Sequence, residues 1–187
     1  MLLSKHPKIH LPGSWPTYFK KAQDCWIWDL DNNKYLDLYS MGIGTNILGY
    51  QNKRVDAVIK KIVNSSNMST LNCPEEVLLA KKLVSMHRWS NMVKFCRTGA
   101  EASAIALRIS KSFTCKDKIA FCGYHGWHDW YLAANVSGNS NLDDQLLPGL
   151  DASGVPNELQ KTAVPFTYGD MSSFELLLNQ YNDIGII

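Results

Sequence analysis

The sequence has 187 residues, of which 45% are hydrophobic and 19% charged, as is usual for a globular protein with one sizeable core. Lys and Arg number 19 against 17 Asp and Glu, and the net charge of +2 without a basic stripe argues against nucleic-acid and membrane-surface binding. Five cysteines without a C-x-x-C pair, and no apolar run of about 18 residues, predict a cytoplasmic protein without disulfides or a membrane span.

The N-terminal part of the chain predicts a β-hairpin. In "CWIWDLDNNKYLDLYSMG", residues 25–42, two apolar runs flank Asp31-Asn32-Asn33, and these residue types accept left-handed turn geometry at low cost. We therefore divide the chain into an N-terminal segment with this hairpin, residues 1–50, and a larger domain, residues 51–187.

Two helices are expected at the start of the larger domain. Residues 54–66 carry valine and isoleucine at helical spacing. Residues 73–87 predict the second helix, because Pro74 suits the first helical position and the two glutamates that follow it suit the positive end of the helix dipole.

Residues 92–122 predict a strand, a helix and a second strand. "MVKFC" (92–96) and "KIAFC" (118–122) are short apolar runs. The helix between them has one apolar face, made of Ala102, Ile105, Ala106, Ile109 and Phe113. Because a strand–helix–strand crossover joins parallel strands, this pattern predicts an α/β fold with a parallel sheet.

The C-terminal part begins with a long polar stretch, residues 137–161, and a loop of that length is usually functional or mobile. A helix over residues 172–181 and a buried strand over residues 184–187 are expected to follow. Buried parallel strands need helical cover on both faces, so a chain that stops in such a strand predicts an incomplete sheet and a truncated C-terminus.

The junction Thr98-Gly99-Ala100-Glu101 has two interpretations. Thr98 and Glu101 fit a capping box, which needs no ligand, and Ser172 and Glu175 repeat the pattern before the last helix. However, the first junction follows a predicted strand directly, and its small residues would let an anion approach the backbone amides at the helix N-terminus. No Gly-Lys-Ser/Thr follows it, and G-x-G-x-x-G is absent, so it is neither a Walker loop nor a dinucleotide fingerprint.

The second predicted strand ends in "CGYHGWHDWY", residues 122–131, on the same expected sheet edge as that helix N-terminus. An aromatic ring there could stack on a flat ligand whose phosphate binds at Gly99 and Ala100. Alternatively, the aromatic side chains only cover the core. A zinc site built from His125, His128 and Asp129 is weaker, because they lie on one loop without a second ligand pair elsewhere.

Three motifs in order, "WDLDNNKYLDLYSMGIGTNILGY", "CRTGAEASAIALRISKSFT" and "YHGWHDW", make the chain from about Leu11 resemble a known family. It is similar to the N-terminal portion of class III pyridoxal-phosphate-dependent aminotransferases, in the glutamate-1-semialdehyde 2,1-aminomutase-like branch. The resemblance implies a fold type I transferase, with part of a mostly parallel large-domain sheet and its helices. It also implies pyridoxal 5′-phosphate (PLP), a small amino substrate and a homodimer.

Carried over motif by motif, the resemblance assigns site residues. Thr98, Gly99 and Ala100 would hold the cofactor phosphate, Tyr124 would stack on the pyridine ring, and His125 would complete that motif. Gly42 and Ile43 would line the substrate pocket. No metal is implied.

The chain departs from the family pattern at several points. Arg97 stands where the family usually has Asn, and Ile43 stands where aminomutases tend to have Trp. The pyridine-binding Asp and the catalytic Lys are expected beyond residue 187, and the family's leading helix ahead of Met1, so no lysine of this chain takes the catalytic role. The substrate alternatives left open are a β- or ω-amino acid and an amino sugar. A catalytically inactive fragment is the non-enzymatic alternative.

Overall fold

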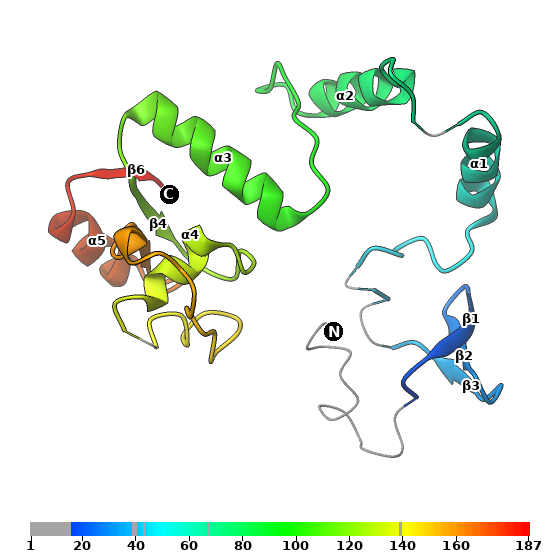
Figure 1. The fold of residues 1–187 in the computed structure, drawn as a ribbon, viewed down its shortest axis with the longest axis horizontal. Helices are drawn as coiled ribbons and strands as arrows, with labels where there is room; N and C mark the ends of the chain where they lie inside the picture. The colour runs from blue at the N-terminus through cyan, green and yellow to red at the C-terminus, as the bar shows by residue number, and fades with distance from the viewer. Residues whose placement is uncertain (1–15, 39–40, 43, 67, 139) are drawn as a thin grey trace. The chain divides into compact units, whose positions relative to one another are not determined.

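The computed structural model describes residues 16–38, 41–42, 44–66, 68–138 and 140–187 (Figure 1). The chain divides into two compact units, residues 1–81 and 82–187. The predicted N-terminal segment (residues 1–50) and larger domain (residues 51–187) are not these two compact units, and that division stays a prediction. Within the described ranges, no helix combines the length and the apolar character that crossing a membrane requires.

The first unit contains the predicted hairpin, in which β2 (Trp26–Asp29) pairs antiparallel with β3 (Lys34–Leu36). Asn32 in the turn has a φ of +67°, which confirms the left-handed geometry. The Asp29 carboxylate accepts hydrogen bonds from the Asn33 backbone, the Asn33 side chain and the Tyr35 hydroxyl at 2.8–2.9 Å. A further strand that the sequence pattern did not predict, β1 (Phe19–Gln23), pairs with β2, so the sheet has three strands.

Both helices expected after the hairpin are present. α1 (Lys53–Asn64) begins after Asn52, whose side chain accepts hydrogen bonds from the Arg54 and Val55 amides. α2 (Pro74–Met86) starts at the proline, as predicted, and the border between the two units falls within it. Neither helix contains a buried residue.

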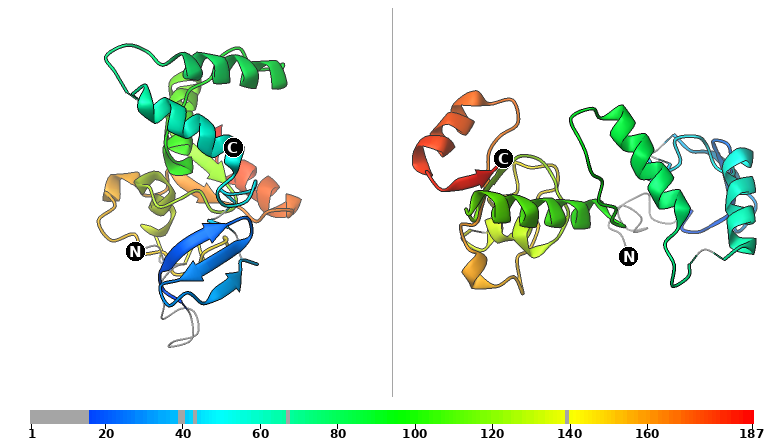
Figure 2. Two further views of the ribbon diagram at one scale, coloured as in Figure 1. Left: turned by 90° about the vertical axis from the view of Figure 1, so that its right-hand side faces the viewer. Right: turned by 90° about the horizontal axis from the view of Figure 1, so that it is seen from above.

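The second unit is built on a three-stranded parallel sheet in the order β5-β4-β6, formed by Ala163–Pro165, Lys118–Phe121 and Ile184–Ile186. α3 (Gly99–Thr114) precedes β4 and packs against β6 (Figure 1, Figure 2). The chain returns through α4 (Asp129–Leu132), two short 3-10 turns and α5 (Met171–Gln180). Parallel strands connected through helices confirm the α/β class.

The core of this unit lies where β4 ends. Phe121, Tyr131 and Leu142 are buried there together with three alanines, and Tyr131 and Leu142 are 0% exposed. The stretch expected to be a mobile or functional loop is tied to this core. Asn135, itself buried, accepts a hydrogen bond from the Leu142 amide and donates one to the Leu150 carbonyl.

The strand predicted over residues 92–96 is wrong. This segment leads into α3 without pairing with another strand of the described ranges, and Met92 is exposed. A short apolar run becomes a strand only where a neighbouring strand accepts its backbone hydrogen bonds, and no described strand pairs with this segment. The sequence pattern also missed β5.

The apolar face of α3 is not the side of the helix that is buried. Ile109 and Phe113 are exposed, whereas Leu107 is the buried residue of this helix. The inward side carries small polar residues, and a side chain at Gly185 of β6 would come within 2.6 Å of the Thr114 hydroxyl. Small residues permit this close approach of helix and strand. Ile109 and Phe113 lie on the exposed side of the helix.

The cap predicted for the last helix is a further correction. α5 begins after Asp170, whose carboxylate accepts hydrogen bonds from the Ser172 and Ser173 amides. The Ser172 hydroxyl donates a hydrogen bond to the Asp170 carboxylate, so Ser172 and Glu175 do not form a capping box. Asp and Ser are both good N-caps, and the residue nearer the preceding turn takes the role here.

Candidate cofactor-phosphate site

The N-terminus of α3 has the predicted capping box. The Thr98 hydroxyl oxygen accepts a hydrogen bond from the Glu101 amide at 3.2 Å. In return, the Glu101 carboxylate accepts hydrogen bonds from the Thr98 amide at 3.1 Å and the Arg97 amide at 2.8 Å. The box therefore satisfies three of the backbone donors at the start of the helix.

The capping box leaves two donors free. In the described part of the chain, the amides of Gly99 and Ala100 have no hydrogen-bond partner, as geometry requires for the first positions of an α-helix. Gly99 is exposed and nothing would obstruct a side chain there. Two amides at the positive end of a 16-residue helix can bind an anion. The capping-box and anion-site interpretations are thus compatible.

The loop after β4 packs directly against this helix start. Gly126 has a φ of +100°, and a Cβ atom built on it would lie 2.8 Å from the Ala100 Cβ. Only glycine at 126 permits so close an approach with such a backbone conformation. This contact brings the carboxyl end of β4 and the N-terminus of α3 together, as the sequence motifs required.

Tyr124 precedes this contact by two residues and is 38% exposed. Its ring stands edge-on to the Tyr131 ring, with centroids 5.7 Å apart. A partly exposed aromatic ring on a loop that packs against a helix N-terminus can offer a surface to a flat ligand.

His125 lies in the aromatic cluster of the core. Its Nε2 is 2.9 Å from the Cys122 carbonyl oxygen, which can only accept, so Nε2 carries the proton. The ring packs against Phe121 and Trp130 at centroid distances of 6.0 and 5.8 Å. No three His, Cys, Asp or Glu side chains of the described residues are grouped to hold a metal ion. A contact of His125 with the cofactor stays a prediction.

The two predicted substrate-pocket residues belong to the first unit. Gly42 has a φ of +76°, and its carbonyl accepts a hydrogen bond from the Thr45 hydroxyl at 2.8 Å, so it lies in a tight turn. Ile43 lies outside the described residues. The role of both residues stays a prediction.

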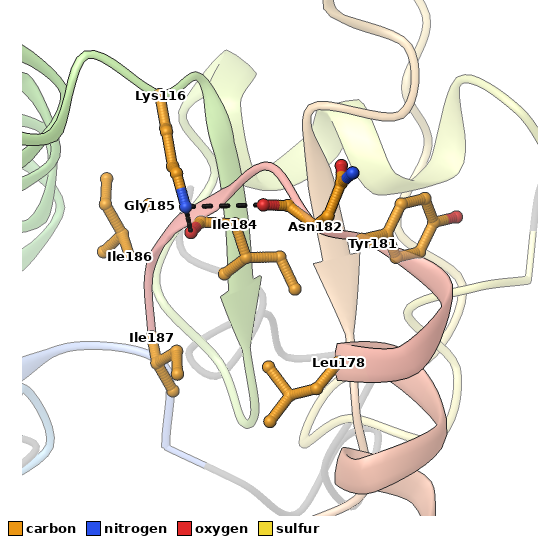
Figure 3. A pocket seen from close by; sticks show the side chains of 8 residues that line it. All are labelled: Lys116, Leu178, Tyr181, Asn182, Ile184, Gly185, Ile186 and Ile187. Carbon is orange, nitrogen blue, oxygen red and sulfur yellow. Dashed lines mark hydrogen bonds between the residues drawn. The ribbon is translucent and has the colours of Figure 1, made fainter.

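A hollow of about 470 Å³ lies elsewhere in the second unit, between α5 and β6 (Figure 3). Lys116 reaches over it and donates to the Asn182 and Ile184 carbonyls at 3.4 and 3.2 Å, so its ammonium group is already engaged. None of the predicted site residues lines this hollow.

Two residues beside Tyr124 were not identified from the sequence. The Tyr131 hydroxyl donates to the Gly123 carbonyl at 3.2 Å, and burial raises the pKa of Tyr131 to about 12. The Gln145 side chain accepts a hydrogen bond from the Gly123 amide. Tyr131 was noticed only as part of an aromatic run, and no sequence signal pointed to Gln145.

Comparison with known proteins gives consistent results. Residues 12–159 match the model of the family described as aminotransferase class-III. The chain is 31% identical, over 96% of its length, to a 3-aminobutyryl-CoA aminotransferase of Cloacimonas acidaminovorans. It is 33% identical, over 92% of its length, to a glutamate-1-semialdehyde 2,1-aminomutase of Methanothrix thermoacetophila. The chain spans 39% of the length of each of these two relatives.

A solved structure shares the fold. The FumI protein of Sphingopyxis sp. MTA144, in its PLP internal aldimine form, superposes with a TM-score of 0.78 at 24% identity. The match covers 97% of this chain and 40% of that protein. The described architecture is therefore part of the fold of that larger protein.

Proposed function

The chain belongs to the class III aminotransferase family, and we propose that it supplies the phosphate cup and the stacking aromatic of a PLP enzyme that moves an amino group. We define the phosphate cup as Thr98, Gly99 and Ala100. The observation that carries the proposal is the packing of Gly126 on Ala100, because it joins the free helix amides to the loop that bears Tyr124.

The residues present fit the cofactor. The amides of Gly99 and Ala100 are free to donate to phosphate oxygens, and the Thr98 hydroxyl lies beside them. The Tyr124 ring, 38% exposed, would pack on the pyridine ring and exclude water from that face. His125 completes the loop and keeps its conformation through the Cys122 carbonyl. When bound, PLP supplies an electron sink for bonds broken at the amine-bearing carbon of the substrate.

For the reaction, we propose amino-group transfer within one molecule, as in glutamate-1-semialdehyde 2,1-aminomutase, with Gly42 and Ile43 in the substrate pocket. The second candidate is an aminotransferase acting on a β-amino group. It is supported by the similarity to the 3-aminobutyryl-CoA aminotransferase and by isoleucine at position 43. ω-Amino acids and amino sugars are further substrate candidates. We propose that the enzyme works as a homodimer in the cytoplasm.

The 187 residues by themselves should bind PLP weakly and catalyse no transfer, because we assign the catalytic role to none of their lysines. A helix N-terminus stabilises an anion by about 0.3–1 kcal/mol, or ~2 kcal/mol where it is partly buried. Stacking on Tyr124 adds roughly 0.5–1.5 kcal/mol. These contributions sum to at most about 3.5 kcal/mol, less than the ~4 kcal/mol of a 1 mM Kd even before the cost of association, so the Kd should lie above about 1 mM.

Replacing Gly99 by proline tests the phosphate cup, because it removes one cup amide while leaving the helix start intact. Proline is favoured at the first helical position, and the extended backbone of Thr98 suits a residue before proline. Gly99→Pro should weaken PLP binding about tenfold, the effect of one hydrogen bond to a charged group. Binding is measured by NMR titration of the purified chain with PLP.

Gly99→Ala is the matched control, since it keeps the amide and its side chain meets open space. It should bind PLP like the wild type. Pyridoxal, which lacks the phosphate, should bind equally to all three proteins. Equal PLP affinity of Gly99→Pro and Gly99→Ala would show that the phosphate binds elsewhere.

A further inference from the structure

The two peptide units on either side of Gly123, the residue before Tyr124, are each held by one hydrogen bond. The Gly123 amide donates to Gln145, and the Gly123 carbonyl accepts a hydrogen bond from the Tyr131 hydroxyl. Gly123 has a φ of +82°, and a side chain there would meet nothing within 4 Å. Glycine is therefore needed at this position for its backbone conformation and not because a side chain would clash. We call Tyr131 and Gln145 the Gly123 clamp.

The two clamp residues are themselves fixed. Tyr131 is 0% exposed, and its ring packs against Phe121 with centroids 5.1 Å apart. Gln145 follows Leu142, which is 0% exposed and whose amide is bonded to Asn135. The backbone amide of Gln145 also donates a hydrogen bond to the Leu142 carbonyl at 3.0 Å. Both side chains therefore hold Gly123 against parts of the molecule that have little freedom to move.

The clamp also reaches the Tyr124 side chain. The Tyr131 hydroxyl donates to Gly123, the residue before Tyr124. The Tyr131 ring stands edge-on to the Tyr124 ring, with centroids 5.7 Å apart. Without the clamp, the left-handed turn at Gly123 could rotate and carry Tyr124 with it. A ring held in advance in its binding orientation loses less conformational entropy when a ligand binds.

We propose that Tyr131 and Gln145 are positioning residues, which hold the Tyr124 ring toward a planar, phosphate-bearing ligand at the phosphate cup. The inference rests on the proposed function, since it takes the ligand to be PLP. Neither residue touches the ligand in this scheme. Their effect passes through Gly123 to Tyr124.

Tyr131→Phe tests the clamp, because it removes the hydroxyl and keeps the buried ring. PLP binding should weaken about three- to tenfold, as the loss of one hydrogen bond between neutral groups predicts. Inorganic phosphate, which contacts the cup but not Tyr124, should bind as it does to the wild type. Gln145→Ala should give the same pattern and faster hydrogen exchange of the Gly123 amide. Tyr168→Phe, at an 88% exposed tyrosine, is the matched control and should change nothing.

A double-mutant cycle with Tyr124→Ala separates positioning from general stability. If the clamp acts through the Tyr124 ring, Tyr131→Phe should weaken PLP binding no further once that ring is absent. An additive loss, an equal loss for PLP and phosphate, or no change in PLP binding by the clamp variants would overturn the inference while the proposed function stands. PLP binding no tighter than that of inorganic phosphate in the wild type would overturn both.

Discussion

The two units of the chain differ in how they use apolar residues. Every buried hydrophobic side chain that the structure describes lies between residues 82 and 187. In the described part of residues 1–81, the only buried side chain is that of Asp29, whereas Val58 and Ile59 of α1 are more than half exposed. Yet both units contain the helices and turns that their local sequence predicts.

Local order and burial therefore have separate causes in this protein. In the first unit, the Asp29 carboxylate closes the hairpin, the Asn52 side chain caps α1, and the Lys34 ammonium lies 4.0 Å from the Trp26 ring centroid. These contacts join residues near one another in sequence or across one hairpin. The second unit adds a core in which residues far apart in the sequence, such as Phe121 and Ala163, are buried together.

The largest expected effect is in the core of the second unit. Leu142→Ala should lower the free energy of unfolding of that unit by about 2–5 kcal/mol, because it removes buried methyl groups and leaves a cavity. Leu146→Ala, four residues away and 75% exposed, should stay within about 0.5 kcal/mol of the wild type. Ile59→Ala in α1 should do the same. Chemical denaturation followed by the NMR signals of β4 and α1 measures all three, and equal losses would remove the distinction between the units.

A smaller effect is expected at the cap of α1. Asn52→Ala leaves the Arg54 and Val55 amides without the acceptor that they now have, which should cost α1 about 1 kcal/mol. Because α1 buries no residue, this cost should appear as fraying of α1, with α3 unchanged. Helical NMR chemical shifts report each helix separately. Asn52→Asp, which keeps an acceptor oxygen, is the control, and unchanged shifts in Asn52→Ala would mean that packing holds α1.

The smallest expected effect concerns two tyrosines, one in each unit. Burial raises the pKa of Tyr50 to about 12, helped by its 2.6 Å hydrogen bond to Asp37, and burial raises the pKa of Tyr131 to about 12, helped by the nearby Tyr124. A raised pKa means that the folded state favours the neutral phenol. The resulting stability is complete below the ordinary value of 10.0 and is lost as the pH rises toward 12.

Two substitutions should separate these causes. Asp37→Asn should lower the pKa of Tyr50 and leave that of Tyr131 unchanged. Tyr124→Phe should lower the pKa of Tyr131 and leave that of Tyr50 unchanged. NMR titration of the tyrosine rings measures both values. A common shift of both tyrosines in either variant would point to a general change of the fold instead.

Local chemistry explains most of what was correctly predicted. The turn at Asn32, the start of α2 at Pro74 and the Thr98–Glu101 box were all predicted from neighbouring residues. Each depends on backbone preferences or on hydrogen bonds that span at most four residues. Such features form in the same way whatever the distant parts of the chain do.

Local sequence thus specifies the hairpin turn, the helices α1, α2, α3 and α5 and the capping box of α3, and it placed the cup residues at a helix start. The tertiary structure decided that residues 92–96 stay unpaired, that Leu107 rather than Phe113 faces inward, and that Gly126 meets Ala100. It also brought Gln145 to Gly123, 22 positions apart in sequence. Strand pairing, the choice of a helix face and contacts between loops depend on partners far along the chain, and no local pattern specifies them.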